Sequence, residues 1–309
     1  MENADLKHLI ENIEKVIIGK TESIKLLISG LLTNGHILIE DVPGLGKTML
    51  ALALAKSING DFKRIQFTPD LLPSDVTGGF VYSPKTGEFD FRKGPIFTNI
   101  LLADEINRTT PRTQSALLES MQEYKVTADG KTFILHQPFM VLATQNPIEY
   151  QGTYPLPEAQ IDRFLMKINM GYLSIAEEVK VISGQKVKHP IESLGPIMNL
   201  ERVLSLQEEV KNIEISPNVL EYIVKLVSAT RQKQEEIKIG ASPRASIALM
   251  KASCAWALIE GRDYVIPDDV AKLSPWVLKH RIVLDPKALI AGKTPEQIIS
   301  ELTRSTPVP

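Results

Sequence analysis

The pattern of hydrophobic and polar positions changes character twice along the chain. The first segment repeats apolar residues at spacings of three and four, at Leu6, Leu9, Ile10, Ile13 and Ile17, which predicts an amphipathic helix. Five short runs rich in β-branched and aliphatic residues then follow, at 36–40, 64–67, 99–104, 139–145 and 164–170. The segments between them are long enough for crossover helices, so we expect an α/β domain with a mainly parallel five-stranded sheet, covered on both faces.

Two of the connecting segments carry alternating patterns of their own. Segment 78–95 alternates aromatic and polar residues on both sides of a turn at 84–87, and segment 124–135 does so around Asp129-Gly130. Alternation around a turn of glycine, proline or aspartate is typical of a β-hairpin. We therefore expect two hairpins inserted into the α/β domain.

Beyond about residue 190, helical spacing replaces the strand pattern. The clearest helices are predicted at 203–213, 219–236 and 243–261. The segment 188–199 contains two prolines and a glycine, which favours a domain boundary there. We predict an α/β domain over 1–190 and a small all-helical domain over 191–309.

Composition narrows the class of protein. The chain of 309 residues has 35 basic and 37 acidic residues and a net charge of -2, which gives no global attraction to nucleic acid or an anionic membrane. Its single cysteine, Cys254, cannot form an intrachain disulfide and is expected to be a small buried hydrophobe. The amino terminus is acidic and polar, and the apolar runs are short for a bilayer. We expect a soluble, cytoplasmic protein without a membrane span.

The candidate chemistry begins in the stretch HILIEDVPGLGKTML, residues 36–50. A strand that enters a glycine-rich turn and then a helix directs several backbone N–H groups at one point, in front of the helix dipole. Such a point suits a phosphate chain. Gly44 and Gly46 permit close approach of the backbone, Lys47 can bridge the terminal phosphates, and the Thr48 hydroxyl can ligate Mg2+.

The strict phosphate-loop pattern fails at one position, because Asp41 stands where the first glycine is usual. That position mostly shapes the turn, so we keep the phosphate-loop interpretation. The alternative is a helix amino terminus with a chance Gly-Lys-Thr; the order of strand, loop and helix argues against it. The predicted nucleotide-binding residues of the loop are Val42, Pro43, Gly44, Leu45, Gly46, Lys47, Thr48 and Met49.

Two adjacent carboxylates end the predicted strand at 99–104. Ligands of parallel sheets bind at the carboxyl ends of the strands, so Asp104 can hold hydrated Mg2+. Glu105 can orient a water for attack on a γ-phosphate. In isolation, a solvated strand end would be the default explanation of this pair. A carboxylate that activates water favours hydrolysis over phosphoryl transfer to another acceptor. The presence of Glu105 does not exclude a kinase.

Several segments, in order, resemble the MoxR branch of the AAA+ ATPases. They are VIIGK, VPGLGKT, ADEINR, ATQNPIEYQGTYPLPEAQIDRF, GASPRA and GRDYVIPDDV. The resemblance implies an AAA+ αβα domain with a helical lid, ATP and Mg2+ as cofactors, and a homo-oligomeric ring, expected to be a hexamer. It also implies ATP hydrolysis coupled to remodelling of protein clients, complex assembly or metal-cofactor insertion, with von Willebrand factor A domain proteins as partners.

The resemblance assigns roles to three further residues. Asn146 matches a polar sensor that can hydrogen-bond the γ-phosphate or the attacking water, whereas turn chemistry before a proline is the alternative. Arg163 matches an arginine finger that reaches the neighbouring subunit's nucleotide; the alternative is an ion pair with Asp162. Arg244 matches a second sensor in the lid. Because it follows a Ser-Pro helix start, where a cation gains nothing from the dipole, we favour the functional role.

Other positions are carried over more loosely. Ile18 and Gly19 match the lining of the adenine pocket, but Lys20 stands where a glutamine is common. Arg108 and Arg112 are as consistent with a solvated or salt-bridged role as with facing a neighbour.

The segment Phe80 to Phe91 is similar to the insert that defines a wider clade, which includes magnesium chelatase subunits. Such inserts tend to project toward the central pore of a ring. Its aromatic residues either grip a client or pack the hairpin onto its own domain, and packing is the default.

Three other classes of function remain possible. A nucleotide-gated scaffold would not require Glu105, Asn146 and Arg163 together. A nucleic-acid motor would be expected to present a basic surface, whereas the hairpins mix acidic and basic residues. A metabolic kinase would need an acceptor pocket, and Arg244 is better explained by an AAA+ lid. The five histidines are scattered, so we expect no metal site besides that for Mg2+.

Overall fold

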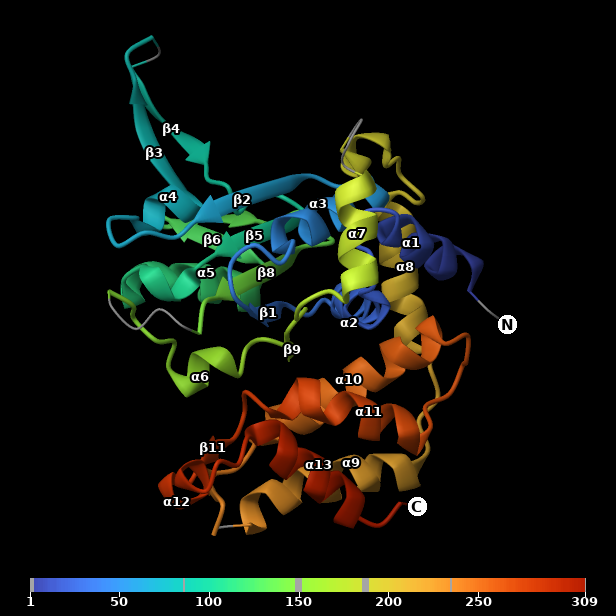
Figure 1. Ribbon diagram of the computed structural model, residues 1–309. Helices are drawn as coiled ribbons and strands as arrows, with labels where there is room; N and C mark the ends of the chain where they lie inside the picture. Colours follow the sequence, from blue (N-terminus) through green and yellow to red (C-terminus); the bar gives the residue numbers. More distant parts are fainter. Residues whose placement is uncertain (1–2, 86, 148–151, 185–188, 234, 309) are drawn as a thin grey trace.

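The computed structural model describes residues 3–85, 87–147, 152–184, 189–233 and 235–308. Its centre is a parallel sheet in the order β2-β5-β8-β1-β9 (Figure 1). The strands are β2 (Phe62–Gln66), β5 (Ile100–Asp104), β8 (Met140–Gln145), β1 (Ile37–Glu40) and β9 (Met166–Ile168). The prediction of a five-stranded parallel sheet is confirmed. Residues 148–151 of the segment 143–164 and residue 86 of the first hairpin turn lie outside the described residues.

Both faces of the sheet are buried, which explains the uninterrupted apolar runs. In β1, Ile37 and Ile39 join one hydrophobic cluster and Leu38 joins the other. The first cluster contains residues of α1 (Ala4–Glu14), α2 (Thr21–Leu32), α3 (Lys47–Ser57) and the lid. The second contains residues of α4 (Pro73–Thr77), α5 (Pro111–Glu123) and the hairpins.

The two predicted hairpins are present. One pairs β3 (Gly78–Ser83) with β4 (Glu88–Lys93) and projects from the body of the molecule, and the other pairs β6 (Lys125–Ala128) with β7 (Lys131–Ile134) (Figure 1). Asp129 and Gly130 have φ values of 47° and 75°, as a tight hairpin turn requires.

The aromatic residues of the projecting hairpin divide into two groups. Phe91 stacks on Phe133 of the other hairpin with ring centroids 3.8 Å apart, and Phe80 lies 5.4 Å from Phe91. Tyr82 and Phe89 contact each other nearer the tip and are 52% and 66% exposed. Packing therefore explains the inner pair, and the outer pair is presented to solvent.

The lid begins after α7 (Ile175–Gly184) and consists mainly of helices. They are α8 (Leu200–Lys211), α9 (Pro217–Gln232), α10 (Pro243–Ile259), α11 (Pro267–Leu278), α12 (Pro286–Ile290) and α13 (Pro295–Ser305). Five of the six begin with a proline at the first helical position, where no N–H is required.

The lid differs from the prediction in one respect. It contains an antiparallel pair, β10 (Ile237–Ile239) with β11 (Val283–Leu284), so it is not all helical. Strands of three and two residues are too short to show a period of two. α9 consequently ends at Gln232 instead of 236, because the chain enters β10.

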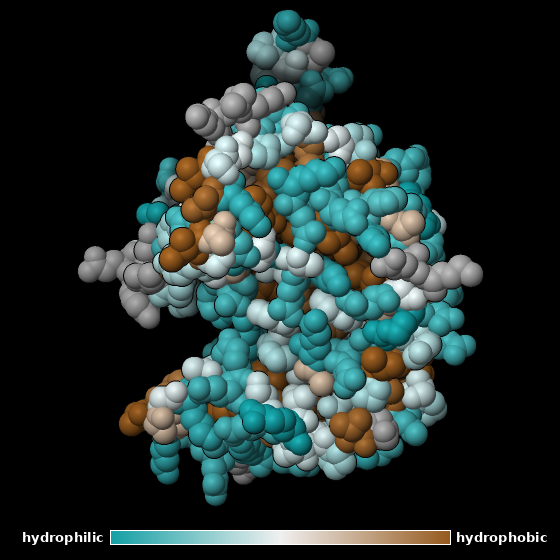
Figure 2. Space-filling model, turned by 45° about the vertical axis from the view of Figure 1, so that its right-hand side comes forward, coloured by the Kyte–Doolittle hydropathy of each residue, from teal (hydrophilic) through white to brown (hydrophobic). Residues whose placement is uncertain are grey.

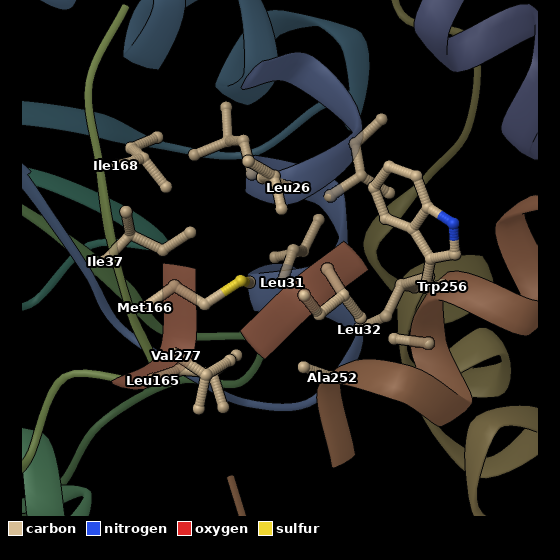
Figure 3. Close-up of a cluster of buried hydrophobic side chains, with 14 of the residues drawn as sticks. Leu26, Leu31, Leu32, Ile37, Leu165, Met166, Ile168, Ala252, Trp256 and Val277 are labelled. Carbon is tan, nitrogen blue, oxygen red and sulfur yellow. The ribbon is translucent and has the colours of Figure 1, made fainter. Parts of the chain in front are cut away.

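The lid and the sheet domain share one hydrophobic cluster. Trp256 and Ala252 of α10 pack near Leu31 and Leu32 of α2, with Val277 of α11 beside Leu165 (Figure 3). Gln207 of α8 also donates a 2.7 Å hydrogen bond to the Leu31 carbonyl. The molecule is nevertheless hollowed on one side between the two domains (Figure 2).

The structure bears on two features of the sequence, the single cysteine and the short apolar runs. Cys254 is buried in α10, and burial raises the pKa of its thiol to about 11, so it is an inert hydrophobe. Among the helices in the described part of the chain, none has both the length and the hydropathy needed to cross a bilayer.

His36, directly before β1, is held in one neutral tautomer. Its Nε2 donates to the Met121 carbonyl at 2.9 Å, and its Nδ1 accepts from the Val141 N–H at 3.0 Å. The ring also packs against Tyr124 and Phe139. Burial lowers the pKa of His36 from 6.5 to about 4.

This shift predicts a loss of stability in mild acid. Between pH 6.5 and about 4 the unfolded chain binds a proton that folded His36 does not, so the free energy of unfolding falls as the pH falls through that window. The full contribution is about 3 kcal/mol for one such group. His36→Gln should flatten this part of the pH dependence in chemical unfolding, and replacement of the exposed His136 by Gln should not. Equal slopes in wild type and His36→Gln would contradict the prediction.

Candidate active site

The turn between β1 and α3 has an open inner surface. Gly44 and Gly46 have φ values of 87° and 84°, and a Cβ at either position would meet no atom within 4 Å. The Lys47 ammonium donates to the carbonyls of Asp41 at 2.7 Å and Val42 at 3.2 Å. Burial lowers the pKa of Lys47, and the charges of Asp41, Asp104 and Glu105 oppose that shift. The turn therefore presents backbone N–H groups and a cation at the start of a helix.

A cavity of about 240 Å3 lies at the carboxyl edge of the sheet beside this turn. It brings together residues of the turn and of strands β2, β5 and β8: Pro43, Gly44, Gly46, Lys47, Thr48, Arg64, Gln66, Asp104, Glu105, Thr144 and Asn146. The structure thus assembles the predicted turn, the acidic pair and Asn146 in one place.

The two carboxylates are held in different ways. Asp104 accepts from Arg64 at 2.6 Å and from the Thr144 hydroxyl at 2.6 Å. Glu105 has left-handed backbone angles, φ 56° and ψ 49°, and its N–H donates to Thr144 Oγ1 at 2.8 Å. A non-glycine residue in this region costs about 1–3 kcal/mol, which persists where surrounding contacts enforce it.

Gln66 and Arg108 contact the Glu105 carboxylate. Gln66 donates at 2.7 Å and Arg108 forms an ion pair at 3.0 Å. The salt-bridged alternative for Arg108 is therefore observed, with Glu105 as the partner. Arg112 is exposed in the first turn of α5.

Sequence reasoning missed three residues of this site: Arg64, Gln66 and Thr144. Arg64 and Gln66 are two apart on β2, so they share one face of the strand, and Thr144 of β8 precedes by two Asn146, the residue after that strand. The polar residues at alternating positions are visible in the sequence, but on an edge strand such a pair usually indicates solvent exposure.

The donor set fits Mg2+. Thr48 and Asp104 both line the cavity and offer a hydroxyl and a carboxylate, and Mg2+ prefers hard oxygen ligands from one or two side chains together with phosphate and water.

A second cavity of about 460 Å3 adjoins the first, because Gly44 and Gly46 line both. Its walls are largely apolar and come from the loop before α2, from the turn and from the segment 170–173, with α7 alongside. Ile18, Leu45 and Met49 line it. An apolar slot beside a phosphate-binding turn suits a planar base.

The remaining predicted binding residues lie at the margins of these cavities. Gly19 has a φ of 73°, in the left-handed region that side chains rarely adopt, so its backbone conformation explains its glycine identity. Val42 lines neither cavity but supplies a carbonyl to Lys47.

Arg163 and Arg244 lie at the opposite edge of the sheet. They line a third cavity of about 240 Å3 together with residues 33–36, which precede β1. Arg163 precedes β9, which runs parallel to β1. Since the turn lies after the carboxyl end of β1 and strands rise about 3.3 Å per residue, strand length separates both arginines from the turn of their own chain.

Neither arginine is neutralised where it lies. Among the side chains that the structure describes, no carboxylate pairs with the Arg163 or Arg244 guanidinium. Asp162, the alternative partner of Arg163, pairs instead with Arg281 at 2.7 Å and accepts from the Ser242 hydroxyl at 3.1 Å. Ser242 also caps α10, as predicted. The third cavity is therefore cationic.

Comparison with known proteins agrees with this architecture. Residues 36–166 match the ATPase family associated with various cellular activities (AAA), and residues 229–302 match the AAA lid domain. These matches define the class as an AAA ATPase with its lid.

Proteins with similar sequences identify the family within this class. The chain is 56% identical to the uncharacterized protein YeaC of Bacillus subtilis (strain 168), over 97% of this chain and 93% of that one. It is 44% identical to Chaperone MoxR1 of Mycobacterium tuberculosis, over 98% and 82%. A crystal structure from Cytophaga hutchinsonii, named as a candidate ATPase, superposes with a TM-score of 0.91 at 42% identity and covers 99% of this chain and 95% of that one. The chain belongs to the MoxR family of AAA+ ATPases.

Thr144→Val tests how the acidic pair is held. Thr144 is 1% exposed, and valine keeps its shape while removing the hydroxyl that joins Asp104 to the Glu105 backbone. We expect ATP turnover to fall about 10- to 100-fold, the effect of one lost hydrogen bond to a charged group, with little change in the Kd for ADP. Thr127→Val, on the exposed face of the second hairpin, is the control. Unchanged turnover in Thr144→Val would contradict this role.

Proposed function

We propose that the protein is an ATP-hydrolysing ring in which each active site is completed by the neighbouring subunit. The observation that carries this proposal is the separation of charges within one chain. Lys47, Asp104 and Glu105 lie at the carboxyl edge of the sheet, whereas Arg163 and Arg244 line a cavity at the amino edge. In a heterologous ring, opposite faces of adjacent subunits meet, which would bring both arginines to a neighbour's nucleotide.

The carboxyl-edge cavity supports the following division of roles. The turn 42–47 and Lys47 hold the phosphates, and Thr48 and Asp104 are the residues that would hold Mg2+, which would neutralise phosphate charge. Glu105 orients the attacking water, and Asn146, 8% exposed in the same cavity, contacts the γ-phosphate or that water.

The contribution of the arginines is electrostatic. A guanidinium near the transferred phosphoryl group stabilises charge on its equatorial oxygens and can raise turnover about 10³- to 10⁵-fold. Arg163 and Arg244 suit this role because the structure gives neither a carboxylate partner within the described residues. Arg244 would then act as a sensor of the neighbour's nucleotide from the first turn of the lid helix α10.

Hydrolysis in such a ring would be coupled to remodelling of protein clients. Tyr82 and Phe89, exposed on the projecting hairpin, support a contact with extended polypeptide, and one relative is named as a chaperone. We keep a hexameric ring, recruitment of clients by von Willebrand factor A domain proteins and a cytoplasmic location as parts of this proposal.

Mixing of two inactive variants tests the shared site. Glu105→Gln and Arg163→Ala should each bind ATP but lose turnover, by about 10³-fold for the arginine. In rings formed from an equal mixture, an Arg163→Ala subunit retains Glu105 and can receive Arg163 from a Glu105→Gln neighbour. Turnover should therefore return to about one quarter of the wild-type rate per site, the random frequency of that pairing around a ring.

The matched control uses Glu105→Gln mixed with the double variant Glu105→Gln/Arg163→Ala. No site in those rings contains Glu105, so turnover should stay absent. Mass measurement at each ratio establishes that mixed assemblies form. If Arg163→Ala alone turns over like wild type, or if mixed rings of the two single variants stay inactive, the shared site is wrong.

A further inference from the structure

Asp41, the residue that departs from the strict phosphate-loop pattern, makes contacts that a glycine cannot make. It is 9% exposed and directly follows β1. Its carboxylate accepts from the backbone N–H of Met170 and, at 3.4 Å, from that of Gly171. Its own N–H donates to the Gln145 carbonyl at 3.3 Å, and its carbonyl accepts from Lys47 at 2.7 Å. Asp41 therefore joins the phosphate turn, β8 and the chain that leaves β9.

The segment that Asp41 holds is Met170 to Leu173, which we name the cover segment. It connects β9 to α7, and all four of its residues line the larger, largely apolar cavity. Met170 is 6% exposed, whereas Tyr172 is 78% exposed. One wall of the cavity is thus a short stretch of irregular chain, which needs hydrogen bonds from elsewhere to keep its position.

A second side chain holds the same segment from the other side of the cavity. The Lys20 ammonium donates to the Tyr172 carbonyl at 2.9 Å. Lys20 precedes α2 and also lines the cavity. Asp41 stands where the strict phosphate-loop pattern has a glycine, and Lys20 stands where a glutamine is common; both bind the backbone of the cover segment.

The chemistry of the two contacts explains why these residue types occur. Among the described residues, the edge strand β9 pairs only with β1, and that pairing ends at Ile168. The N–H groups of Met170 and Gly171 therefore lie beyond the end of the β1–β9 ladder. A carboxylate makes stronger hydrogen bonds to N–H groups than a neutral acceptor does. A glycine at 41 would remove that acceptor and leave buried N–H groups without it.

We propose that Asp41 and Lys20 are positioning residues that hold the cover segment against the base of a bound nucleotide. Through Asp41, this segment is tied to the turn that binds the phosphates, so that base and phosphate are recognised by one connected unit. The inference deepens the proposed nucleotide site and rests on it.

The test distinguishes recognition of the base from recognition of the phosphates, because it compares the Kd for ADP with the Kd for inorganic pyrophosphate. Calorimetric titration gives the Kd for ADP in the presence of Mg2+, and displacement of ADP gives the Kd for pyrophosphate. In Asp41→Gly, which restores the strict pattern, ADP binding should weaken about tenfold, as expected for loss of a charge-assisted hydrogen bond. Pyrophosphate binding should change by less than about twofold, because pyrophosphate does not reach the cover segment.

Two further variants test the carboxylate of Asp41 and the ammonium of Lys20 separately. Asp41→Asn keeps a side-chain oxygen that can accept from Met170 and should restore most of the affinity for ADP. Lys20→Met keeps the aliphatic stem and removes the ammonium; it should weaken ADP binding about threefold, again without affecting pyrophosphate. Asp129→Gly, in the distant hairpin turn, is the matched control and should bind both ligands like wild type.

The outcomes are distinguishable from failure of the proposed function. If wild type binds neither ligand, the nucleotide site itself is wrong. If wild type binds both and Asp41→Gly weakens both equally, Asp41 acts only on the phosphate turn and the inference fails, as it does if neither affinity changes. A melting curve reports whether Asp41→Gly folds; if it does not, Lys20→Met decides the question by the same comparison.

Discussion

A buried cation at the junction of the two domains determines how the lid sits on the sheet. The Arg281 side chain is only 2% exposed and pairs with Asp162 at 2.7 Å. It also donates to the carbonyls of Phe164 at 2.6 Å and Leu165 at 3.0 Å, in the chain that enters β9. Burial lowers the pKa of Arg281 to about 10, and Asp162 opposes the shift, so the group stays charged at neutral pH. Removing either partner would leave an uncompensated buried charge or acceptor.

The same junction joins the two segments that carry Arg163 and Arg244. Asp162 is adjacent in sequence to Arg163, and its second oxygen binds Ser242, the cap of the helix that carries Arg244. One carboxylate thus joins the two segments that present the cations of the amino-edge cavity. The two domains also share the hydrophobic core around Trp256 (Figure 3), so a change of lid angle would disturb both this core and the hydrogen bonds of Asp162.

The sequence predicted the parts of the fold that depend on local chemistry. The five strands and the two hairpins follow from patterns within a few residues, as does the helix start at Ser242-Pro243. The phosphate turn and the acidic pair were predicted for the same reason, and the structure brings both to one cavity. Arg281 was not found, because Asp162, Phe164 and Leu165 lie more than 100 residues away and no local signal marks a buried arginine. Arg64 and Thr144 were missed likewise, since their role appears only once β2, β5 and β8 lie side by side.

The stacking of Phe91 on Phe133 connects the projecting hairpin to the body of the domain. It joins the projecting hairpin to the second one, and that second hairpin starts directly after Tyr124 at the end of α5. The Tyr124 hydroxyl binds the Asn34 carbonyl at 2.6 Å, and both residues line the cavity that contains Arg163. Phe91, Phe133 and Tyr124 therefore connect the projecting hairpin, through contacts between side chains and one hydrogen bond, to the edge of the sheet that carries Arg163 and Arg244.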